Sequence, residues 1–414
     1  MAALVLLVVL GLATVSLSSA APGTAGLDSA TGSGPVMGYD NWYLDHCHAS
    51  EGRVLSEARA LMSTGLAAAG YRTVIVDDCW MAASRTPGGQ LTWNKAAFPD
   101  GIPGLAAKIH AMGLKFGLYE DAGLRTCALL PGDLGHYSTD VRTFKSWHVD
   151  LVKIDMCQFP QHSSYSQIAA DFTQLGRDLA AAGIAYDSEL PVKALIEFGD
   201  GSPQYMQAVR MSAAHAGMWR VAVDARSAPW LKLIERQRQL PRLNNGREFP
   251  LTNLVGSYAN VVMRGFAVDL PLAAYARPGH WNDLDVLVPG NPNYGWTDSQ
   301  AMSQMSVWAE LASPLIVSTN LTTLSPALLA DLKNPAMIAI DQSGRQGREI
   351  TSQGPVIAVG KPDPTGGTAL LLVNVSTKSS RFDVPLTRLG FHGASLSVTN
   401  IWSGVSRTVT GRFR

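Results

Sequence analysis

The stretch Leu151-Val152-Lys153-Ile154-Asp155-Met156-Cys157 decides the fold of this chain. Its leucine, valine and isoleucine give the apolar run that is typical of a buried parallel strand. Lys153 and Asp155 interrupt that run, and because they are two residues apart they lie on one face of the strand. Inward-facing charges are costly unless they are paired or used. The stretch therefore predicts the carboxyl end of a strand in an α/β barrel, where such barrels build their active sites.

Strand-like and helix-like segments alternate on both sides of this stretch. Helical periodicity fills residues 50–69, 102–112 and 137–147, each ahead of a β-branched or apolar run. Eight strands joined by helices are the number of a (β/α)8 TIM barrel. The eight strand-like runs are residues 36–42, 73–78, 115–121, 151–157, 184–189, 218–224, 280–287 and 314–319.

The pattern changes at about Met337, after which short strands are separated by Gly, Pro and Ser turns. This change predicts a C-terminal antiparallel β-sandwich, although no closing strand is obvious before Arg414. The predicted fold class is thus α/β, a (β/α)8 barrel followed by a sandwich. We expect a signal peptide at residues 1–20, the catalytic barrel at 21–336 and the sandwich domain at 337–414.

The N-terminal segment resembles the apolar core of a secretory signal. Residues 3–19 are rich in Leu and Val, and small residues follow up to Pro22, but the usual basic start is missing. A membrane anchor is the alternative, although the run is shorter than the ~20 residues that span a bilayer. We therefore expect a secreted, extracellular protein that does not stay in the membrane after cleavage.

The overall composition limits the class of partner. Lys and Arg total 33, as do Asp and Glu, so the net charge is zero and no basic patch points to nucleic acid. The Rossmann glycine fingerprint and the P-loop are absent. Four cysteines, an even number in an apparently exported chain, indicate disulfides, and their spacing leaves all three pairings open.

Charged side chains, most of them acids, stand at the ends of the predicted strands. HExxH, CxxC and calcium-loop spacings are absent, so we expect no metal and no cofactor. Two carboxylates on different strands suit glycoside hydrolysis, while other barrel chemistries stay open. The strand-end residues are Asp77, Asp78, Asp121, Lys153, Asp155, Glu189, Arg220, Asp224, Asp283 and Asp285.

Longer motifs point to one family. In chain order they are Met37–Trp42, Gly65–Tyr71, Asp77–Trp80, Phe98–Ile102, Gly113–Tyr119, Thr126–Cys127, Pro131–Gly132, Lys153–Cys157 and Pro278–Asp285. Together they resemble glycoside hydrolase family 27, the melibiase family of retaining α-galactosidases and α-N-acetylgalactosaminidases. The resemblance runs from about Val36 to Arg348, and its motifs are long and correctly spaced.

The resemblance implies the catalytic roles. Asp155 would be the nucleophile that forms a covalent glycosyl-enzyme, and Asp224 the general acid/base. A retaining enzyme holds these two carboxyls ~5–5.5 Å apart, and a lysine beside Asp155 would favour its ionised form. Structural ion pairs are the alternatives, with Lys153 for Asp155 and with Arg220 or Arg226 for Asp224.

The resemblance also implies a galactose-binding set and two disulfides. Helix capping is the alternative for the two adjacent acids, and core packing is the alternative for the aromatic residues. Cys47 would pair with Cys79, and Cys127 with Cys157. The implied contacts are Asp77 and Asp78 to the 4- and 6-hydroxyls, Lys153 to the 3- and 4-hydroxyls, Arg220 and Glu189 near the 2-position, Asp285 at the rim, and Trp42 and Tyr119 as lining.

The chain departs from the family pattern in its fifth strand, which reads Asp187-Ser188-Glu189-Leu190. Glu189 leaves less room for an N-acetyl group, so we predict an exo-α-galactosidase that acts on raffinose-type oligosaccharides or galactomannans. Isomalto-dextranase, β-L-arabinopyranosidase and a non-catalytic carbohydrate-binding barrel are the alternatives. The expected partner is a carbohydrate, with a homodimer open as an oligomeric state.

Overall fold

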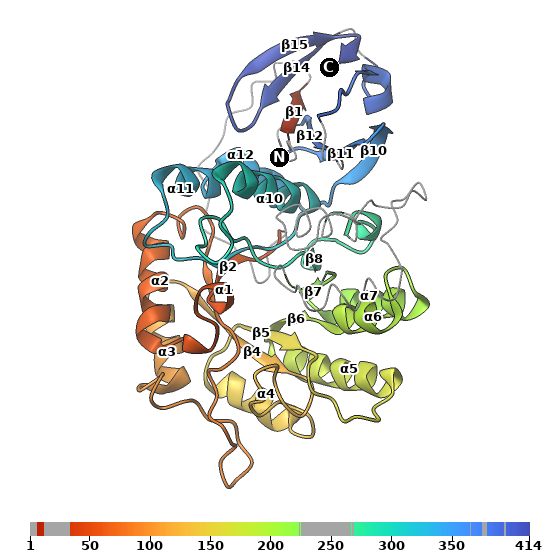
Figure 1. The fold of residues 1–414 in the computed structure, drawn as a ribbon. Coiled ribbons are helices and arrows are strands. Elements are labelled where there is room, and N and C mark those ends of the chain that lie inside the picture. The colour runs from red at the N-terminus through yellow and green to blue at the C-terminus, as the bar shows by residue number, and fades with distance from the viewer. Residues whose placement is uncertain are drawn as a thin grey trace.

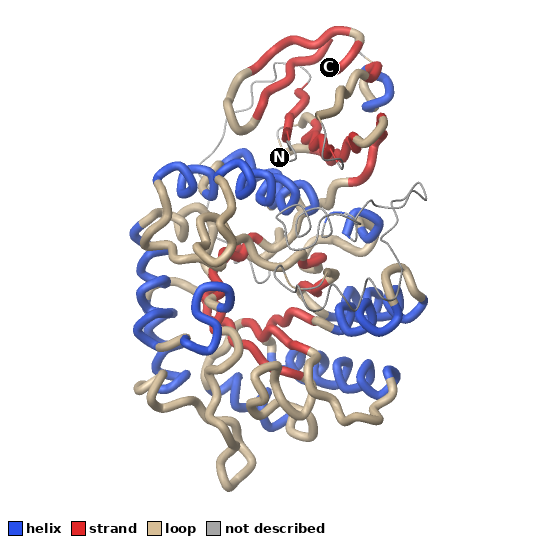
Figure 2. The backbone as a smooth tube through the Cα atoms, in the orientation of Figure 1, coloured by secondary structure: helices blue, strands red, loops and turns tan. Residues whose placement is uncertain are grey.

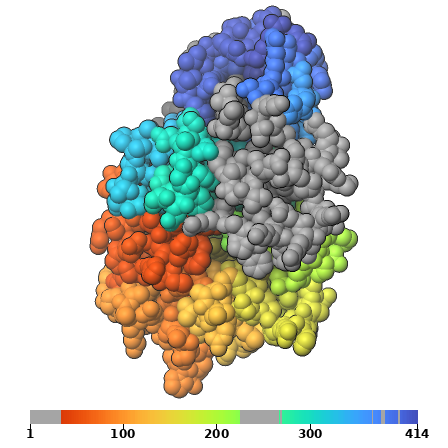
Figure 3. Space-filling model, viewed as in Figure 1, coloured from red at the N-terminus to blue at the C-terminus, as the bar shows by residue number. Residues whose placement is uncertain are grey.

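The computed structural model describes residues 34–222, 224, 266, 269–364, 366–374, 379–392 and 395–414, together with the backbone of residues 6–11. These parts form a barrel and a β-sandwich that is stacked against one side of it (Figures 1 and 3). The predicted fold class is therefore confirmed.

A curled sheet of eight parallel strands forms the barrel (Figure 2). Its strands neighbour one another in the order β8-β7-β6-β5-β4-β3-β2-β9, and a parallel bridge between Leu287 and Val317 links the two ends of this order. Every strand lies inside the range predicted for it. The strands are β2 (Met37–Asp40), β3 (Thr73–Val76), β4 (Lys115–Asp121), β5 (Leu151–Asp155), β6 (Ala185–Ser188), β7 (Met218–Arg220), β8 (Trp281–Asp283) and β9 (Leu315–Val317).

Helices follow the strands and cover the outside of the barrel (Figure 2). Their ends follow local signals: α5 begins at a capping box between Ser164 and Gln167 and ends at Gly183 in the left-handed conformation. In the described part of the chain, the helices up to β9 are α1 (Trp42–Asp45), η1 (His46–His48), α2 (Glu51–Ser63), α3 (Gly101–Ala111), α4 (Tyr137–Ser146), α5 (Tyr165–Ala182), α6 (Leu190–Phe198), α7 (Pro203–His215), η2 (Leu270–Leu272) and α10 (Asp298–Leu311).

One helix is shorter than the sequence predicted. The periodic pattern extended from residue 50 to 69, but α2 ends at Ser63. Gly65 adopts a φ of 82°, a left-handed conformation that an α-helix does not contain, and turns lead from there to β3. The apolar residues beyond Ser63 are buried in these turns instead, as Leu66 is.

An antiparallel sheet forms most of the sandwich, in the order β10-β11-β12-β1-β14-β15, and β13 pairs with β16 in a second sheet. β1 (Leu6–Gly11) belongs to the predicted signal segment, and its backbone pairs with β12 and β14. The other strands are β10 (Arg348–Gln353), β11 (Val356–Pro362), β12 (Thr368–Asn374), β13 (Val384–Pro385), β14 (Ser395–Asn400), β15 (Ser406–Thr410) and β16 (Arg412–Phe413), with η3 (Leu386–Leu389) after β13.

Helices persist slightly beyond residue 337, where the sequence pattern changed. α11 (Pro326–Leu332) and α12 (Pro335–Asp341) precede the first sandwich strand, β10. α10 lies against β11 and β12, which explains why it is buried almost all round rather than on one face.

Buried polar contacts accompany this packing of helix against sandwich. Lys361 of β11 donates to the carbonyl oxygens of Ala309, at 2.7 Å, and Arg345, at 3.0 Å. The side chain of Lys361 thus links the sandwich to the last turn of α10. Among the residues that the structure describes, no helix has both the length and the hydropathy that a bilayer crossing requires.

Candidate active site

Asp155 stands at the end of β5, beside the end of β4. Tyr119 and Asp121 of β4 lie in register with Lys153 and Asp155. The Tyr119 hydroxyl donates to Asp155 Oδ2 at 2.8 Å, and the backbone N–H of Met156 donates to Oδ1 at 2.7 Å. Both oxygens of Asp155 are therefore held by donors, and the carboxylate is fixed at the carboxyl end of the barrel.

Lys153 pairs with an acid from the loop after β3. Its Nζ lies 2.8 Å from Asp77 Oδ2, and both side chains are largely buried. Burial favours a neutral amine, but Asp77, Asp40 and Glu189 outweigh it and hold the pKa of Lys153 well above its usual value. Lys153 is thus a charged donor at the floor of the site.

Asp77 and Asp78 follow β3, and both are buried. The two oxygens of Asp78 accept the backbone N–H groups of Cys79, at 2.6 Å, and Ala128, at 2.9 Å. Burial raises the pKa of Asp78 to about 6, although these two hydrogen bonds oppose the rise. Asp78 therefore ties the loop after β3 to the loop after β4.

Arg220 joins the acids on the other side of the barrel. It ends β7, and only 1% of it is exposed. Its guanidinium lies 3.1 Å from Glu189, 3.2 Å from Asp224 and 3.4 Å from Asp285. One buried cation therefore organises three carboxyls that come from three different places in the sequence.

The Asp224 carboxyl differs from these neighbours because it is half exposed. The surrounding protein raises its pKa by desolvation, Arg220 opposes this effect, and the charges of Asp285 and Asp155 add to the rise. Asp155 and Asp224 thus act on one another electrostatically. Their roles as nucleophile and acid/base stay a prediction.

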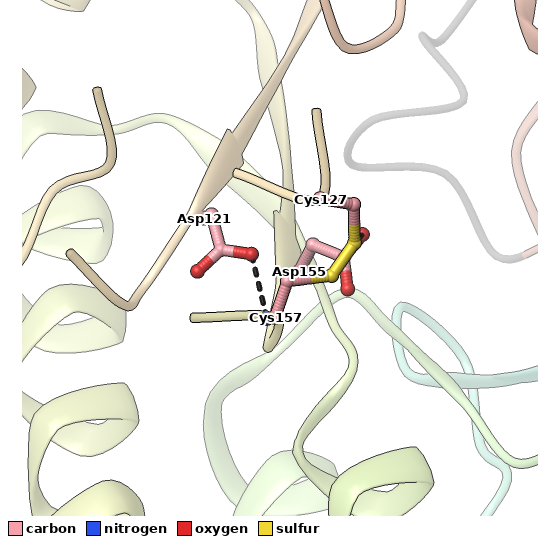
Figure 4. Close-up of side chains that lie close together, drawn as sticks. All are labelled: Asp121, Cys127, Asp155 and Cys157. Carbon is pink, nitrogen blue, oxygen red and sulfur yellow. Dashed lines mark hydrogen bonds between the residues drawn. A yellow bond between two sulfur atoms is a disulfide. The ribbon is translucent and has the colours of Figure 1, made fainter. Parts of the chain in front are cut away.

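The cysteines are paired as the resemblance implied, Cys47 with Cys79 and Cys127 with Cys157. In Figure 4 the second disulfide lies beside Asp155, with Asp121 on the other side. Asp121 accepts the backbone N–H of Cys157 at 2.7 Å, and Cys127 Sγ is 3.3 Å from Asp155 Oδ2. The disulfide therefore holds the loop that carries Asp155.

This group of two acids and two cysteines is compact enough to suggest a metal site. Metal binding by cysteine needs the thiolate, and both sulfurs are committed to the disulfide. The two carboxylates that remain are too few ligands for a closed site. Within the described parts of the chain, no other such group of His, Cys, Asp and Glu comes as close together.

The structure also places Trp42 and Asp285, two further residues of the predicted sugar site. Trp42 opens α1, is partly exposed and makes an edge contact with His46 at a centroid distance of 5.0 Å. Asp285 accepts a hydrogen bond from the Tyr43 hydroxyl at 2.7 Å. Arg226, the alternative partner of Asp224, and most of the connection from 231 to 277 lie outside the described residues.

Sequence reasoning missed three residues of this site. Tyr43 follows the predicted first strand, Asp40 lies inside that strand, and Asp187 lies inside the fifth. The strand pattern could have identified Asp40 and Asp187 as candidate site residues, because each interrupts an apolar strand as Lys153 and Asp155 do. Tyr43 carried no comparable signal.

Comparisons with known proteins identify the family of the chain. The sequence profile of the family described as Alpha galactosidase A matches residues 41–228 and 255–343. A probable alpha-galactosidase A from Aspergillus fumigatus is 34% identical over 89% of this chain and 66% of its own length. An alpha-galactosidase from Oryza sativa is 28% identical over 93% of this chain and 82% of its own. The chain spans about two thirds of the length of the Aspergillus relatives.

Solved structures share the fold. A putative alpha-galactosidase from Bacteroides fragilis has a TM-score of 0.74 at 25% identity and covers 92% of this chain and 77% of its own. Alpha-galactosidase I from Mortierella vinacea has a TM-score of 0.74 at 24% identity, over 94% of this chain and 95% of its own. With the family profile matched over more than half of its residues, this chain belongs to the alpha galactosidase A family.

Proposed function

We propose that this protein is a retaining exo-glycosidase that hydrolyses terminal α-D-galactosyl residues. One observation supports the proposal. Tyr119 holds Asp155 and Arg220 holds Asp224, and the charge of Asp155 acts on Asp224. Family membership supports the same reaction.

The two carboxyls would divide the chemistry in the manner of retaining glycosidases. Asp155 attacks the anomeric carbon while Asp224 gives its proton to the departing glycosidic oxygen, so that a glycosyl ester forms and the aglycone leaves. Asp224 then takes a proton from water, and the resulting hydroxide attacks the anomeric carbon and frees Asp155. The raised pKa of Asp224 suits its first task, because the group must carry a proton before it can act as an acid.

Galactose recognition would come from the buried charges around this pair. Lys153 is a charged donor held by Asp77, which suits it to the 3- and 4-hydroxyls. Asp78 would accept from the 6-hydroxyl. Glu189 and Arg220 form a buried ion pair that fits the 2-hydroxyl region and leaves little space for an N-acetyl group.

The remaining expectations form part of the same proposal. The barrel, residues 21–336, would be catalytic, Trp42 would form a wall of the sugar site, and the sandwich at 337–414 would support the barrel. Secretion fits the two disulfides and the apolar start of the chain. The substrates would be raffinose-type oligosaccharides or galactomannan side chains.

Parallel assays of nitrophenyl α-galactoside, nitrophenyl β-L-arabinopyranoside and dextran would test the specificity. We expect turnover of nitrophenyl α-galactoside. NMR should show that galactose is released as the α anomer. Asp155→Gly and Asp224→Ala should each lower kcat by at least about a thousandfold, since each removes a reacting group. Asp178→Asn is the matched control, because this half-buried acid of α5 accepts from Ser138 and Gln174 rather than from residues of the site. Cleavage of only the arabinoside or only dextran would contradict the galactosidase assignment.

A further inference from the structure

Two sulfurs and two carboxylates lie close together beside the proposed nucleophile. The residues are Asp121, Cys127, Asp155 and Cys157, and one ligand atom from each lies within 4.8 Å of the other three (Figure 4). Cys127 Sγ lies 3.3 Å from Asp155 Oδ2, and Asp121 Oδ2 lies 2.7 Å from the backbone nitrogen of Cys157. In the structure the bond between the two sulfurs is what keeps this group from binding a metal ion.

The two carboxylates are held independently of the disulfide. Asp121 accepts the backbone N–H groups of Gly123 and Cys157, each at 2.7 Å and each on a different oxygen. The oxygens of Asp155 accept from Met156 and Tyr119. Each carboxylate oxygen has a second lone pair, so it can bind a metal ion and keep its hydrogen bond. Both acids should therefore stay in place when the disulfide opens.

Reduction of the disulfide completes a set of four ligands. A dithiol supplies two electrons and two protons, the bond between Cys127 and Cys157 breaks, and two thiols form while the dithiol becomes a disulfide. Cys127 is exposed, which gives a dithiol access to the bond. A zinc ion then displaces the two thiol protons and binds both sulfurs as thiolates.

The spacing of the group fits zinc in particular. Zinc bonds of about 2.3 Å to sulfur and about 2.1 Å to oxygen place tetrahedral ligand atoms roughly 3.4 to 3.8 Å apart. The 3.3 Å between Cys127 Sγ and Asp155 Oδ2 is already close to this range, and the two sulfurs can separate once their bond is broken. Thiolate ligands favour zinc over magnesium and calcium, which prefer oxygen.

We propose that reduction of the disulfide between Cys127 and Cys157 creates a zinc site whose other two ligands are Asp121 and Asp155. The bound ion occupies the carboxylate that attacks the sugar in the proposed mechanism, so zinc inhibits the reduced enzyme and leaves the oxidised enzyme active. The inhibition rests on the proposed function, because it requires Asp155 to be the nucleophile. The binding of the metal does not depend on that function.

Cadmium absorption tests the site without any substrate. The whole chain is reduced with a dithiol, freed of it under argon and titrated with cadmium, whose bonds to thiolates give an ultraviolet charge-transfer band. We expect one cadmium ion per reduced chain and no band for the oxidised chain. After reduction, Cys47→Ser/Cys79→Ser should keep the band, because the proposed ligands remain. Cys127→Ser/Cys157→Ser should lose it.

Asp121→Asn tests whether a carboxylate completes the site. Calorimetry on the reduced protein should show zinc affinity at least about tenfold below that of the reduced wild type, because one ligand is lost. Asp178→Asn, whose carboxyl accepts from Ser138 and Gln174, should bind zinc as the wild type does. If Asp121→Asn does not fold, Cys127→Ser replaces it, since loss of one thiolate should weaken zinc binding at least as much.

Activity assays test the capture of the nucleophile. Zinc at a concentration that saturates the site should abolish turnover of nitrophenyl α-galactoside by the reduced enzyme, and a chelator should restore it. The oxidised enzyme should keep its rate at the same zinc concentration. Equal inhibition of the two forms, or a reduced enzyme that stays active with zinc bound, would contradict the assignment of Asp155 as a ligand.

Thermal unfolding decides the case in which reduction weakens the fold. A ligand that binds only the folded state raises Tm, so zinc should raise the Tm of the reduced protein and leave that of the oxidised protein unchanged. A reduced protein that zinc does not stabilise would overturn the proposal, as would a cadmium band that persists in Cys127→Ser/Cys157→Ser. If the wild type fails to cleave α-galactosides, the proposed function is wrong, while the cadmium band and Tm still decide whether the site forms.

Discussion

The Tyr119 hydroxyl lies 2.8 Å from Oδ2 of Asp155, and the two side chains come from neighbouring strands of the barrel. Burial, and then the charge of Asp155, raise the pKa of Tyr119 well above its usual value. The phenol therefore stays protonated and donates its hydrogen bond throughout the working pH range. It fixes one oxygen of the proposed nucleophile and leaves the carboxylate in a single orientation.

Tyr119→Phe should slow the reaction without unfolding the protein. A hydrogen bond to a charged group is worth roughly 1.5–3 kcal/mol, so we expect kcat to fall by about 10- to 100-fold. Steady-state kinetics on nitrophenyl α-galactoside provides the measurement. Tyr137→Phe is a matched control, because that hydroxyl donates to the backbone oxygen of Ala122 rather than to an acid. Equal losses in the two variants would refute a specific role for Tyr119.

Lys153→Met should destabilise the fold as well as remove sugar binding. The change leaves Asp77 buried beside Asp40 without its cation, and breaking a buried pair costs about 3–5 kcal/mol. Urea unfolding would measure this loss. The double variant Lys153→Met/Asp77→Asn should recover part of the stability but no activity. A double variant no more stable than the single one would show that the ion pair is not the cause.

Glu57 should make stability depend on pH. It is 5% exposed on α2 and accepts the backbone N–H of Leu321 at 2.9 Å, while burial raises its pKa to about 7. The folded state holds the Glu57 proton more tightly than the unfolded state does. The stabilisation that this proton gives is therefore complete below about pH 4.5 and is lost as the pH rises through about 7.

Glu57→Gln should remove that dependence. The amide oxygen can still accept from Leu321, so the free energy of unfolding should fall less steeply between pH 4.5 and 7, by at most about 1.4 kcal/mol per pH unit. Chemical unfolding at several pH values tests this. Glu197→Gln serves as the control, since that acid forms a pair with Lys193 near the surface. Identical slopes for the Glu57 variant and the wild type would contradict the assignment.

The barrel could be predicted from the sequence because β-branched and apolar runs alternate with helical patterns. Such runs identify β3 and β5 without knowledge of their neighbours. Helix ends were less predictable: α2 stops at Ser63 because of the backbone at Gly65, although the apolar pattern continues. The pairing of β1 with β12 and β14 could not be foreseen, because an apolar run near an N-terminus has the same composition as a signal.

The candidate site was predictable where family motifs marked it, as for Asp155 and Asp224. Contacts between distant segments were not. Tyr43 and Asp285 are 242 residues apart, and their hydrogen bond exists only once the barrel has closed. Periodicity indicates which face a side chain occupies, but not which partner it meets there.

The disulfide between Cys127 and Cys157 should matter for activity as well as for stability. It joins the loop after β4 to the residues that follow Asp155, across a sequence separation of 30. Opening a loop of that length costs roughly 2–4 kcal/mol of stability, and Asp121 alone would then hold the Cys157 backbone. We expect Cys127→Ser/Cys157→Ser to lower both Tm and kcat.

The control is the Cys47→Ser/Cys79→Ser variant, which opens a loop of nearly equal length. It should show a similar loss of Tm with a smaller loss of kcat, because neither of its cysteines adjoins Asp155. Equal kcat for the two double variants would show that the disulfide stabilises the fold without orienting the carboxylate.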